Sequence, residues 1–135
     1  MAQIKVLLVD DERDFATALS ERLRLRDYDA RAVFDINGAF AAMTDAHPDV
    51  VLLDLRMPGM DALQIFKRIK EHSPEVEVII VSGQLASSSA DLELKGLAFD
   101  YIVKPVEIDE VTKRIKQAYS QRLNNIQRNQ TLNGQ

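Results

Sequence analysis

Polar residues that could carry out chemistry follow four of the short apolar runs in this sequence. Asp10 and Asp11 follow the first run, Asp54 the third, Ser82 the fourth and Lys104 the fifth. The carboxyl ends of parallel strands meet at one edge of a sheet, and α/β proteins bind their ligands there. The spacing therefore predicts three carboxylates, one hydroxyl and one ammonium group at a shared edge.

These side chains suit phosphoryl chemistry assisted by a metal ion. Clustered carboxylates repel one another and raise the pKa of at least one of them unless a cation holds them. Carboxylate oxygens around one open side are ligands that favour Mg²⁺. A carboxylate can attack phosphorus and form an aspartyl phosphate. The added charge then requires a metal ion, a cation such as Lys104 and a hydroxyl donor such as Ser82.

Each of these residues also has a simpler structural explanation. Asp10 or Asp11 could cap the following helix, and Asp54 could begin a turn. The pair Ser82-Gly83 could open a loop, and Lys104 could be a solvated strand end. A shared position at four strand ends favours the joint interpretation over four separate structural roles.

The elements that must position these side chains are five short strands alternating with five helices. The expected strands are Ile4–Val9, Ala30–Phe34, Val50–Leu53, Val76–Val81 and Tyr101–Val103. The expected helices are Arg13–Arg26, Asn37–Ala46, Asp61–His72, Ser89–Leu97 and the segment from Ile108 onward. Three of the strands are nearly continuous in Val, Ile and Leu, which is typical of parallel strands covered on both faces. The pattern predicts a three-layer, doubly wound α/β sandwich around a five-stranded parallel sheet.

Two of these elements carry more specific expectations. The second strand, Ala30–Phe34, is short and contains alanine, which favours an edge of the sheet. In the helix Ser89–Leu97, Leu92 and Leu94 are the side chains expected to be buried.

Composition bounds the class of protein. The chain has 135 residues, with 17 Lys plus Arg against 21 Asp plus Glu, and no cysteine. This length suits one domain, and the net negative charge argues against direct nucleic-acid binding. Disulfides, cysteine zinc sites and thiol nucleophiles are excluded. No apolar run approaches the ~18 residues of a membrane span, and the start has no signal-peptide pattern. We expect a soluble, cytoplasmic domain that binds neither nucleic acid nor membrane.

Four ordered motifs then resemble the receiver domain of two-component response regulators, the family that includes the single-domain chemotaxis regulator. They are Val9-Asp10-Asp11, the segment Leu53 to Asp61, Val81-Ser82-Gly83 and the segment Asp100 to Pro105. The resemblance runs from about Ile4 to Tyr119 and implies a receiver domain over residues 1–120. It also implies the flavodoxin-like strand order 2-1-3-4-5.

The resemblance implies a role for each acidic residue. Asp54 corresponds to the aspartate that accepts a phosphoryl group from a sensor histidine kinase or a phosphotransfer protein. Mg²⁺ would be bound by Asp11, by Asp54 and by the backbone carbonyl of Arg56, with Asp10 acting through a metal-bound water. The domain would then be a regulatory switch rather than an enzyme.

Other positions carry phosphoryl-binding and switching roles by the same resemblance. Lys104, Ser82 and Gly83 would contact the phosphoryl group, and Pro105 would follow a cis peptide bond. Tyr101 would turn inward when Ser82 moves toward the phosphoryl group.

Some positions depart from the family pattern or vary within it. Leu97-Ala98 stands where Gly-Ala is common, Ser82 replaces the commoner Thr, and Val106 stands where an aromatic residue is frequent. Arg56 and Gln84 flank the site at variable positions that tune the lifetime of the phosphoryl group in the family.

The resemblance places the output on the face formed by Ser89–Leu97, Tyr101–Val103 and Ile108–Tyr119. This face would control a partner or an output domain, and it could also form a homodimer. Residues 121–135 are rich in Asn and Gln and form either a polar tail or the start of a linker. Leu123 and Ile126 continue the apolar spacing of the last helix, so a longer helix could also support dimerisation.

Two other functions compete with the switch. A phosphorylation-independent interaction domain could keep the fold, although the complete acidic set, Ser82 and Lys104 argue against it. A Mg²⁺-dependent aspartyl-nucleophile phosphatase usually places its nucleophile after the first strand in an Asp-x-Asp pattern. Here Asp10 and Asp11 are adjacent, and the chain is too short for a cap domain.

Overall fold

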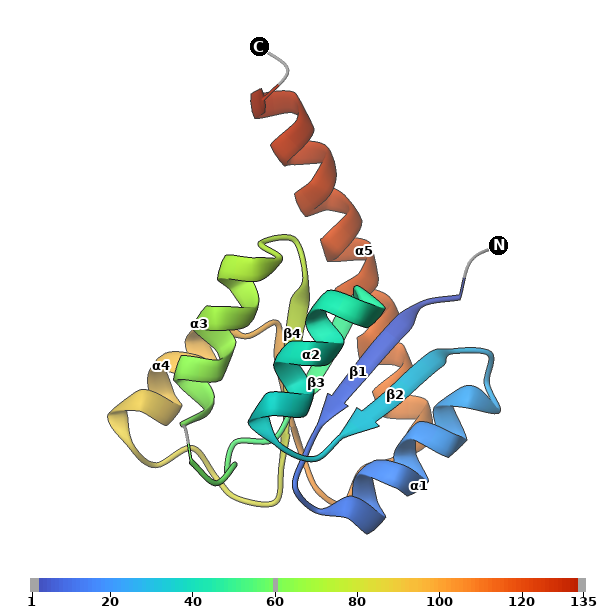
Figure 1. The fold of residues 1–135 in the computed structure, drawn as a ribbon, viewed down its shortest axis with the longest axis vertical. Coiled ribbons are helices and arrows are strands. Elements are labelled where there is room, and N and C mark those ends of the chain that lie inside the picture. The colour runs from blue at the N-terminus through green and yellow to red at the C-terminus, as the bar shows by residue number, and fades with distance from the viewer. Residues whose placement is uncertain (1–2, 60, 134–135) are drawn as a thin grey trace.

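Five parallel strands form the centre of the molecule, with helices on both faces (Figure 1). The computed structural model describes residues 3–59 and 61–133. The strands are β1 (Lys5–Val9), β2 (Asp29–Val33), β3 (Val50–Leu53), β4 (Glu77–Ser82) and β5 (Asp100–Val103). The helices are α1 (Arg13–Arg24), α2 (Ile36–Ala46), α3 (Ala62–His72), α4 (Ser89–Leu97) and α5 (Ile108–Asn133). The strand order is β2-β1-β3-β4-β5, as predicted.

Side-chain alternation along the central strands divides the core into two layers. Alternate residues of a strand point to opposite faces of the sheet, and Leu7 and Val9 belong to the layer against α2, α3 and α4. Val6 and Leu8 belong to the other layer, against α1 and α5. Both sets are buried, which explains why the central strands are apolar throughout rather than alternating.

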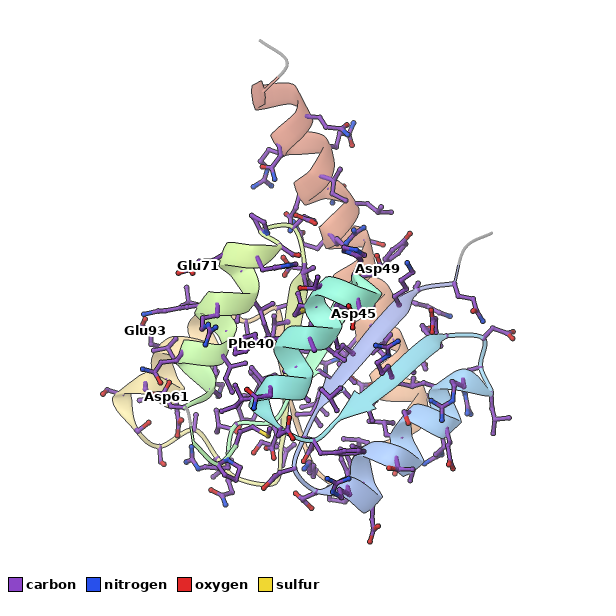
Figure 2. All side chains as sticks on the ribbon, viewed as in Figure 1. Phe40, Asp45, Asp49, Asp61, Glu71 and Glu93 are labelled. Atoms are coloured by element: carbon purple, nitrogen blue, oxygen red, sulfur yellow. The ribbon has the colours of Figure 1, made fainter. Side chains whose placement is uncertain are left out.

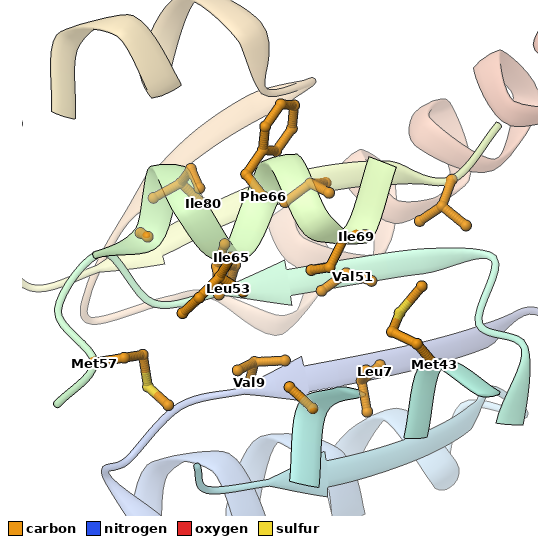
Figure 3. Close-up of a cluster of buried hydrophobic side chains, with 14 of the residues drawn as sticks. Leu7, Val9, Met43, Val51, Leu53, Met57, Ile65, Phe66, Ile69 and Ile80 are labelled. Carbon is orange, nitrogen blue, oxygen red and sulfur yellow. The ribbon is translucent and has the colours of Figure 1, made fainter. Parts of the chain in front are cut away.

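Figure 3 shows the first of these layers. Leu7 and Val51 from the sheet lie close to Met43 of α2 and to Ile69 of α3 (Figure 3). Each of these side chains is almost completely buried. The outer strand β2 is only partly buried, so the prediction that the second strand lies at an edge is confirmed.

Side-chain caps determine where three of the helices begin. The carboxylates of Asp35 and Asp61 accept hydrogen bonds from Gly38 N (2.7 Å) and Gln64 N (2.8 Å), at the starts of α2 and α3. Asp61, labelled in Figure 2, was predicted as the first helical residue of α3 and is instead its cap. Ser88 begins α4, because its hydroxyl accepts from the backbone N–H of Asp91 in a capping box.

The prediction for the buried face of α4 was half wrong. Leu94 is fully buried, whereas Leu92 is 57% exposed. Residues two positions apart in an α-helix point in nearly opposite directions, so these two leucines cannot share a face. The residue that shares the buried face with Leu94 is Asp91, three positions earlier.

The last helix continues well past the sheet. α5 spans 26 residues, about 39 Å at the usual rise, and Figure 1 shows its end projecting away from the strands. Arg122 pairs with Asp49 at 3.3 Å, and the side chain of Asn125 donates to Glu77 Oε1 at 2.8 Å. The segment from residue 121 to 133 is therefore helical. Residues 134 and 135 of the predicted tail lie outside the described residues.

Within residues 3–59 and 61–133, no helix is long and apolar enough to cross a lipid bilayer.

Shortening a side chain to alanine should lower the free energy of unfolding more in the docked part of α5 than in its projecting part. Ile115 is fully buried and Leu123 is 46% exposed on the same helix. We expect Ile115→Ala to lower the free energy of unfolding by about 2–5 kcal/mol, because it leaves a cavity. Leu123→Ala should change it by less than about 0.5 kcal/mol. Urea denaturation followed by circular dichroism measures both values, and similar losses for the two variants would contradict the docking of α5.

Candidate functional site

The carboxyl ends of four strands bring together the side chains that the sequence predicted. Asp10 follows β1, Asp54 follows β3, Ser82 ends β4 and Lys104 follows β5. Two of them, Asp54 and Ser82, line a cavity of about 390 Å³. Its lining consists of Asp11, Glu12, Asp54, Arg56, Ser82, Gly83 and Gln84.

Main-chain hydrogen bonds fix the two buried carboxylates. The backbone N–H of Asp10 donates to Val33 O (3.1 Å), and that of Asp54 donates to Val9 O (2.9 Å), so both residues extend the sheet ladder. The Asp10 carboxylate also accepts from Glu12 N at 2.9 Å. Asp10 and Asp54 are only 4% and 5% exposed. Their positions follow from the strands rather than from flexible loops.

Lys104 is the cation of the site. Its Nζ lies 2.8 Å from Asp10 Oδ2, 2.7 Å from Glu12 Oε1 and 3.9 Å from Asp54 Oδ2. The ammonium group also lies 4.2 Å from the centre of the Phe15 ring. Burial lowers the pKa of Lys104, but its hydrogen bonds to Asp10 and Glu12 more than offset this and leave that pKa raised. Lys104 therefore remains charged at neutral pH.

The backbone around Lys104 also belongs to the site. Its N–H donates to Ser82 O at 2.9 Å, which continues the β4–β5 ladder. The Lys104–Pro105 peptide bond is cis.

The environment of Asp54 disfavours its negative charge. Burial raises the pKa of this carboxyl to about 6, and the neighbouring Asp10 contributes in the same direction. Lys104 and the backbone N–H of Arg56 act against the shift. Asp54 is thus mainly ionised at neutral pH, in a position where an added cation would be stabilising.

Three carboxylates come close enough to hold a metal ion. Oxygens of Asp10, Glu12 and Asp54 all lie within 4.8 Å of one another. An all-oxygen set open to a cavity fits Mg²⁺, which keeps several of its waters. Asp11, which the resemblance implied as a ligand, is exposed and lies outside this cluster, although it lines the same cavity. Glu12 was not predicted as a site residue. The only feature of the sequence that could have indicated it is its position directly after Asp10 and Asp11.

The side chain of Arg56 turns toward α4. Its guanidinium binds both carboxylate oxygens of Asp91, at 3.0 and 2.9 Å, and its Nε donates to Gln84 Oε1 at 2.8 Å. Hydrogen bonds from Arg56 hold the pKa of Asp91 well below its usual range, although burial acts in the opposite direction. Sequence reasoning missed Asp91; the Ser88-x-x-Asp91 spacing is a local signal for the helix cap, but it does not indicate a contact with Arg56.

Gln84 connects the two residues predicted to switch. Its backbone N–H donates to Ser82 Oγ at 3.2 Å, and its carbonyl accepts a hydrogen bond from the hydroxyl of Tyr101. Tyr101 is half-buried, and its ring lies 5.4 Å from the Nζ of Lys95. Ser82 and Tyr101 are thus joined through one loop residue.

Comparison with known proteins gives a consistent result. The family model described as response regulator receiver domain matches residues 6–116. Regulatory protein AtoC of Escherichia coli is 32% identical over 114 residues, which cover 84% of this chain and 25% of that protein. The DNA-binding transcriptional regulator NtrC of Salmonella typhimurium is 35% identical over 115 residues, which cover 85% of this chain and 24% of that protein. The chain therefore spans about a quarter of the length of these relatives.

Solved structures agree on the fold. A CheY-like receiver domain protein from Methanospirillum hungatei superposes with a TM-score of 0.82 at 19% identity, covering 91% of this chain and 98% of that one. NtrX from Brucella abortus, solved with ADP, superposes with a TM-score of 0.85 at 27% identity. That match covers 96% of this chain and 30% of NtrX.

The raised pKa of Asp54 leads to a pH-dependent prediction. A carboxyl whose pKa is about 6 in the folded chain and about 3.9 when unfolded loses stabilising free energy as the pH rises through that window. Asp54→Asn removes this loss. We expect the variant to be more stable than the wild type at pH 7, with an advantage that shrinks toward pH 4. Denaturation without divalent metal at both pH values tests this, and a pH-independent difference would contradict it.

Proposed function

The chain belongs to the response regulator receiver domain family, and on that premise we propose that it is a phosphorylation-dependent switch whose phosphoacceptor is Asp54. The observation that carries this proposal is the placement of Asp54. It is a buried carboxylate beside a second carboxylate, Asp10, and a buried cation, Lys104, at the edge of a cavity. The domain acts as a regulatory element rather than as an enzyme.

In the proposed reaction an oxygen of Asp54 attacks phosphorus on a phosphohistidine of a sensor kinase or a phosphotransfer protein. The new O–P bond forms as the P–N bond breaks, and the imidazole leaves with the electron pair. Asp54 must be ionised, which its pKa of about 6 allows at neutral pH. We place this domain in the cytoplasm, so the phosphohistidine of the donor protein would also be exposed to the cytoplasm.

The remaining residues stabilise the added charge. Lys104 shifts from its carboxylate partners toward the phosphoryl oxygens, and the Ser82 hydroxyl and the Gly83 N–H donate to them. When bound, Mg²⁺ would neutralise part of the phosphoryl charge. Its proposed ligands are Asp11, Asp54, the carbonyl of Arg56 and Asp10 through water, and the carboxylate cluster adds Glu12 as a further candidate.

The signal passes from the phosphoryl group to the face formed by α4, β5 and α5. Movement of Ser82 toward the phosphoryl group changes its contact with Gln84, which also accepts from Tyr101. Tyr101 lies on β5 and contacts Lys95 of α4. One loop residue therefore connects the phosphorylation site to two elements of the output face.

This face, or the projecting part of α5, is proposed to control an output region or to form a homodimer. The relatives AtoC and NtrC are about four times longer than the matched segment, and NtrC is a DNA-binding transcriptional regulator. The 135-residue chain carries a net charge of −4, so we propose that it does not bind nucleic acid directly.

Phosphorylation of Asp54 can be tested directly. Incubation with acetyl phosphate and Mg²⁺ should add one phosphoryl group to the wild type, detected by intact mass, and none to Asp54→Asn. Asp45→Asn is the matched control, because Asp45 is exposed on α2 and lies at its far end (Figure 2). A wild type that stays unmodified would rule out the switch in favour of a phosphorylation-independent interaction domain, and equal modification of Asp54→Asn would rule out Asp54 as the phosphoacceptor.

The role of the extended helix α5 in dimerisation can be tested by changing one apolar residue. Leu123 is partly exposed on α5, and Leu123→Lys would place a charge in an apolar seam between two copies. Sedimentation should show a wild-type dimer in the presence of beryllofluoride and Mg²⁺, and a monomer for this variant. Asn124→Lys, on the neighbouring exposed position, should leave the dimer intact. Equal behaviour of the two variants would exclude the α5 seam as the interface.

A further inference from the structure

Arg56 stands two residues after the proposed phosphoacceptor but directs its charge away from it. Three of its nitrogens bind groups at the start of α4 and in the loop before it. They donate to Gln84 Oε1 (2.8 Å), to both oxygens of Asp91 (3.0 and 2.9 Å) and to Ser87 Oγ (3.4 Å). Among the described residues, the guanidinium forms its ion pair with Asp91 and none with Asp54.

Asp91 is built to hold this cation. Its side chain is 9% exposed, and one of its oxygens also accepts from the backbone N–H groups of Ser87 (3.2 Å) and Ser88 (3.3 Å). Its own N–H donates to Ser88 Oγ at 3.0 Å. The bonds from Ser87 and Ser88 orient the carboxylate independently of Arg56. Formation of the two-point contact with Arg56 therefore costs little additional side-chain entropy at Asp91.

The guanidinium also feels the charge of the phosphorylation site: hydrogen bonds to Asp91 are the main cause of the raised pKa of Arg56, and the charge of Asp54 contributes in the same direction. Arg56 lines the cavity that contains Asp54, and its backbone N–H lies 3.4 Å from Asp54 Oδ1. A phosphoryl group on Asp54 would add about two negative charges and three strong acceptor oxygens to this cavity. Asp91 and the phosphoryl group are therefore alternative acceptors for one guanidinium.

We propose that Asp91 is a positioning residue that holds Arg56 against α4 and so determines the lifetime of a phosphoryl group on Asp54. This inference rests on the proposed function. In hydrolysis, a water oxygen attacks phosphorus on the side opposite Asp54, and the bond between phosphorus and the Asp54 oxygen breaks. Asp54 is released as a carboxylate, and both water protons leave on the inorganic phosphate as dihydrogen phosphate, which then equilibrates with solvent. With Arg56 held by Asp91, the cavity stays open to that water.

Loss of the Asp91 charge frees the guanidinium to pair with the phosphoryl oxygens. Pairing stabilises the phosphorylated state, and the bulk of the side chain blocks the approach of water. Asp91→Asn should therefore slow hydrolysis on the order of tenfold, the scale of one charge-assisted hydrogen bond. The effect must pass through Arg56.

The experiment is a double-mutant cycle on the rate of dephosphorylation. The wild type, Asp91→Asn, Arg56→Gln and the double variant are phosphorylated with acetyl phosphate, freed of donor, and followed by intact mass in Mg²⁺. Asp91→Asn should slow hydrolysis when Arg56 is present and have no effect when Gln replaces it. Glu93→Gln is the matched control, because it removes an exposed carboxylate of the same helix that pairs with Lys67 and leaves the Arg56–Asp91 pair, so its rate should equal that of the wild type.

The outcomes separate this inference from the function on which it rests. An unmodified wild type would remove the proposed function itself. If all variants are phosphorylated, the inference is overturned by an unchanged or faster rate in Asp91→Asn. It is equally overturned by a rate change that persists in the Arg56→Gln background, or by Glu93→Gln reproducing the effect. Circular dichroism on each variant confirms that the compared chains are folded.

Discussion

The contact of the Lys104 ammonium with two carboxylates is the interaction on which the site depends. Asp10 and Asp54 are buried side by side, and two such charges without a cation would be strongly unfavourable. The Lys104 Nζ lies 2.8 Å from Asp10 Oδ2 and 3.9 Å from Asp54 Oδ2, and its charge acts against the rise in the pKa of Asp54. Lys104 only partly offsets the effects of burial and of the Asp10 charge, because the pKa of Asp54 still rises to about 6. The remaining imbalance favours binding of a further cation.

The parallel sheet makes this contact possible. Asp10, Asp54 and Lys104 come from positions 94 residues apart at the extremes, yet each directly follows a strand of the same sheet. Backbone N–H groups of Asp10, Asp54 and Lys104 continue the strand ladders, so the register of the strands sets the spacing of the charges. Two buried layers of apolar side chains then fix that register. The positions of the charged groups in the site therefore depend on the packing of the core.

The sequence predicted those parts of the molecule that depend on local pattern. Continuous apolar runs indicated the central strands, and β3 has the predicted bounds. The pattern was wrong at Leu92, because two residues two positions apart cannot share a helix face. Glu12 and Asp91 were missed for a different reason. Their roles depend on Lys104 and Arg56, which lie 92 and 35 residues away, and no local signal reports such contacts.

We propose that Asp10 and Asp54 form a cation site in which burial raises the pKa of Asp54. Calorimetric titration of Mg²⁺ into the protein, in buffers of different ionisation enthalpy, measures the protons released on binding. With the pKa of Asp54 at about 6, one Mg²⁺ should displace about half a proton at pH 6 and almost none at pH 8. Absence of Mg²⁺ binding, or release that does not depend on pH, would contradict this account of the site.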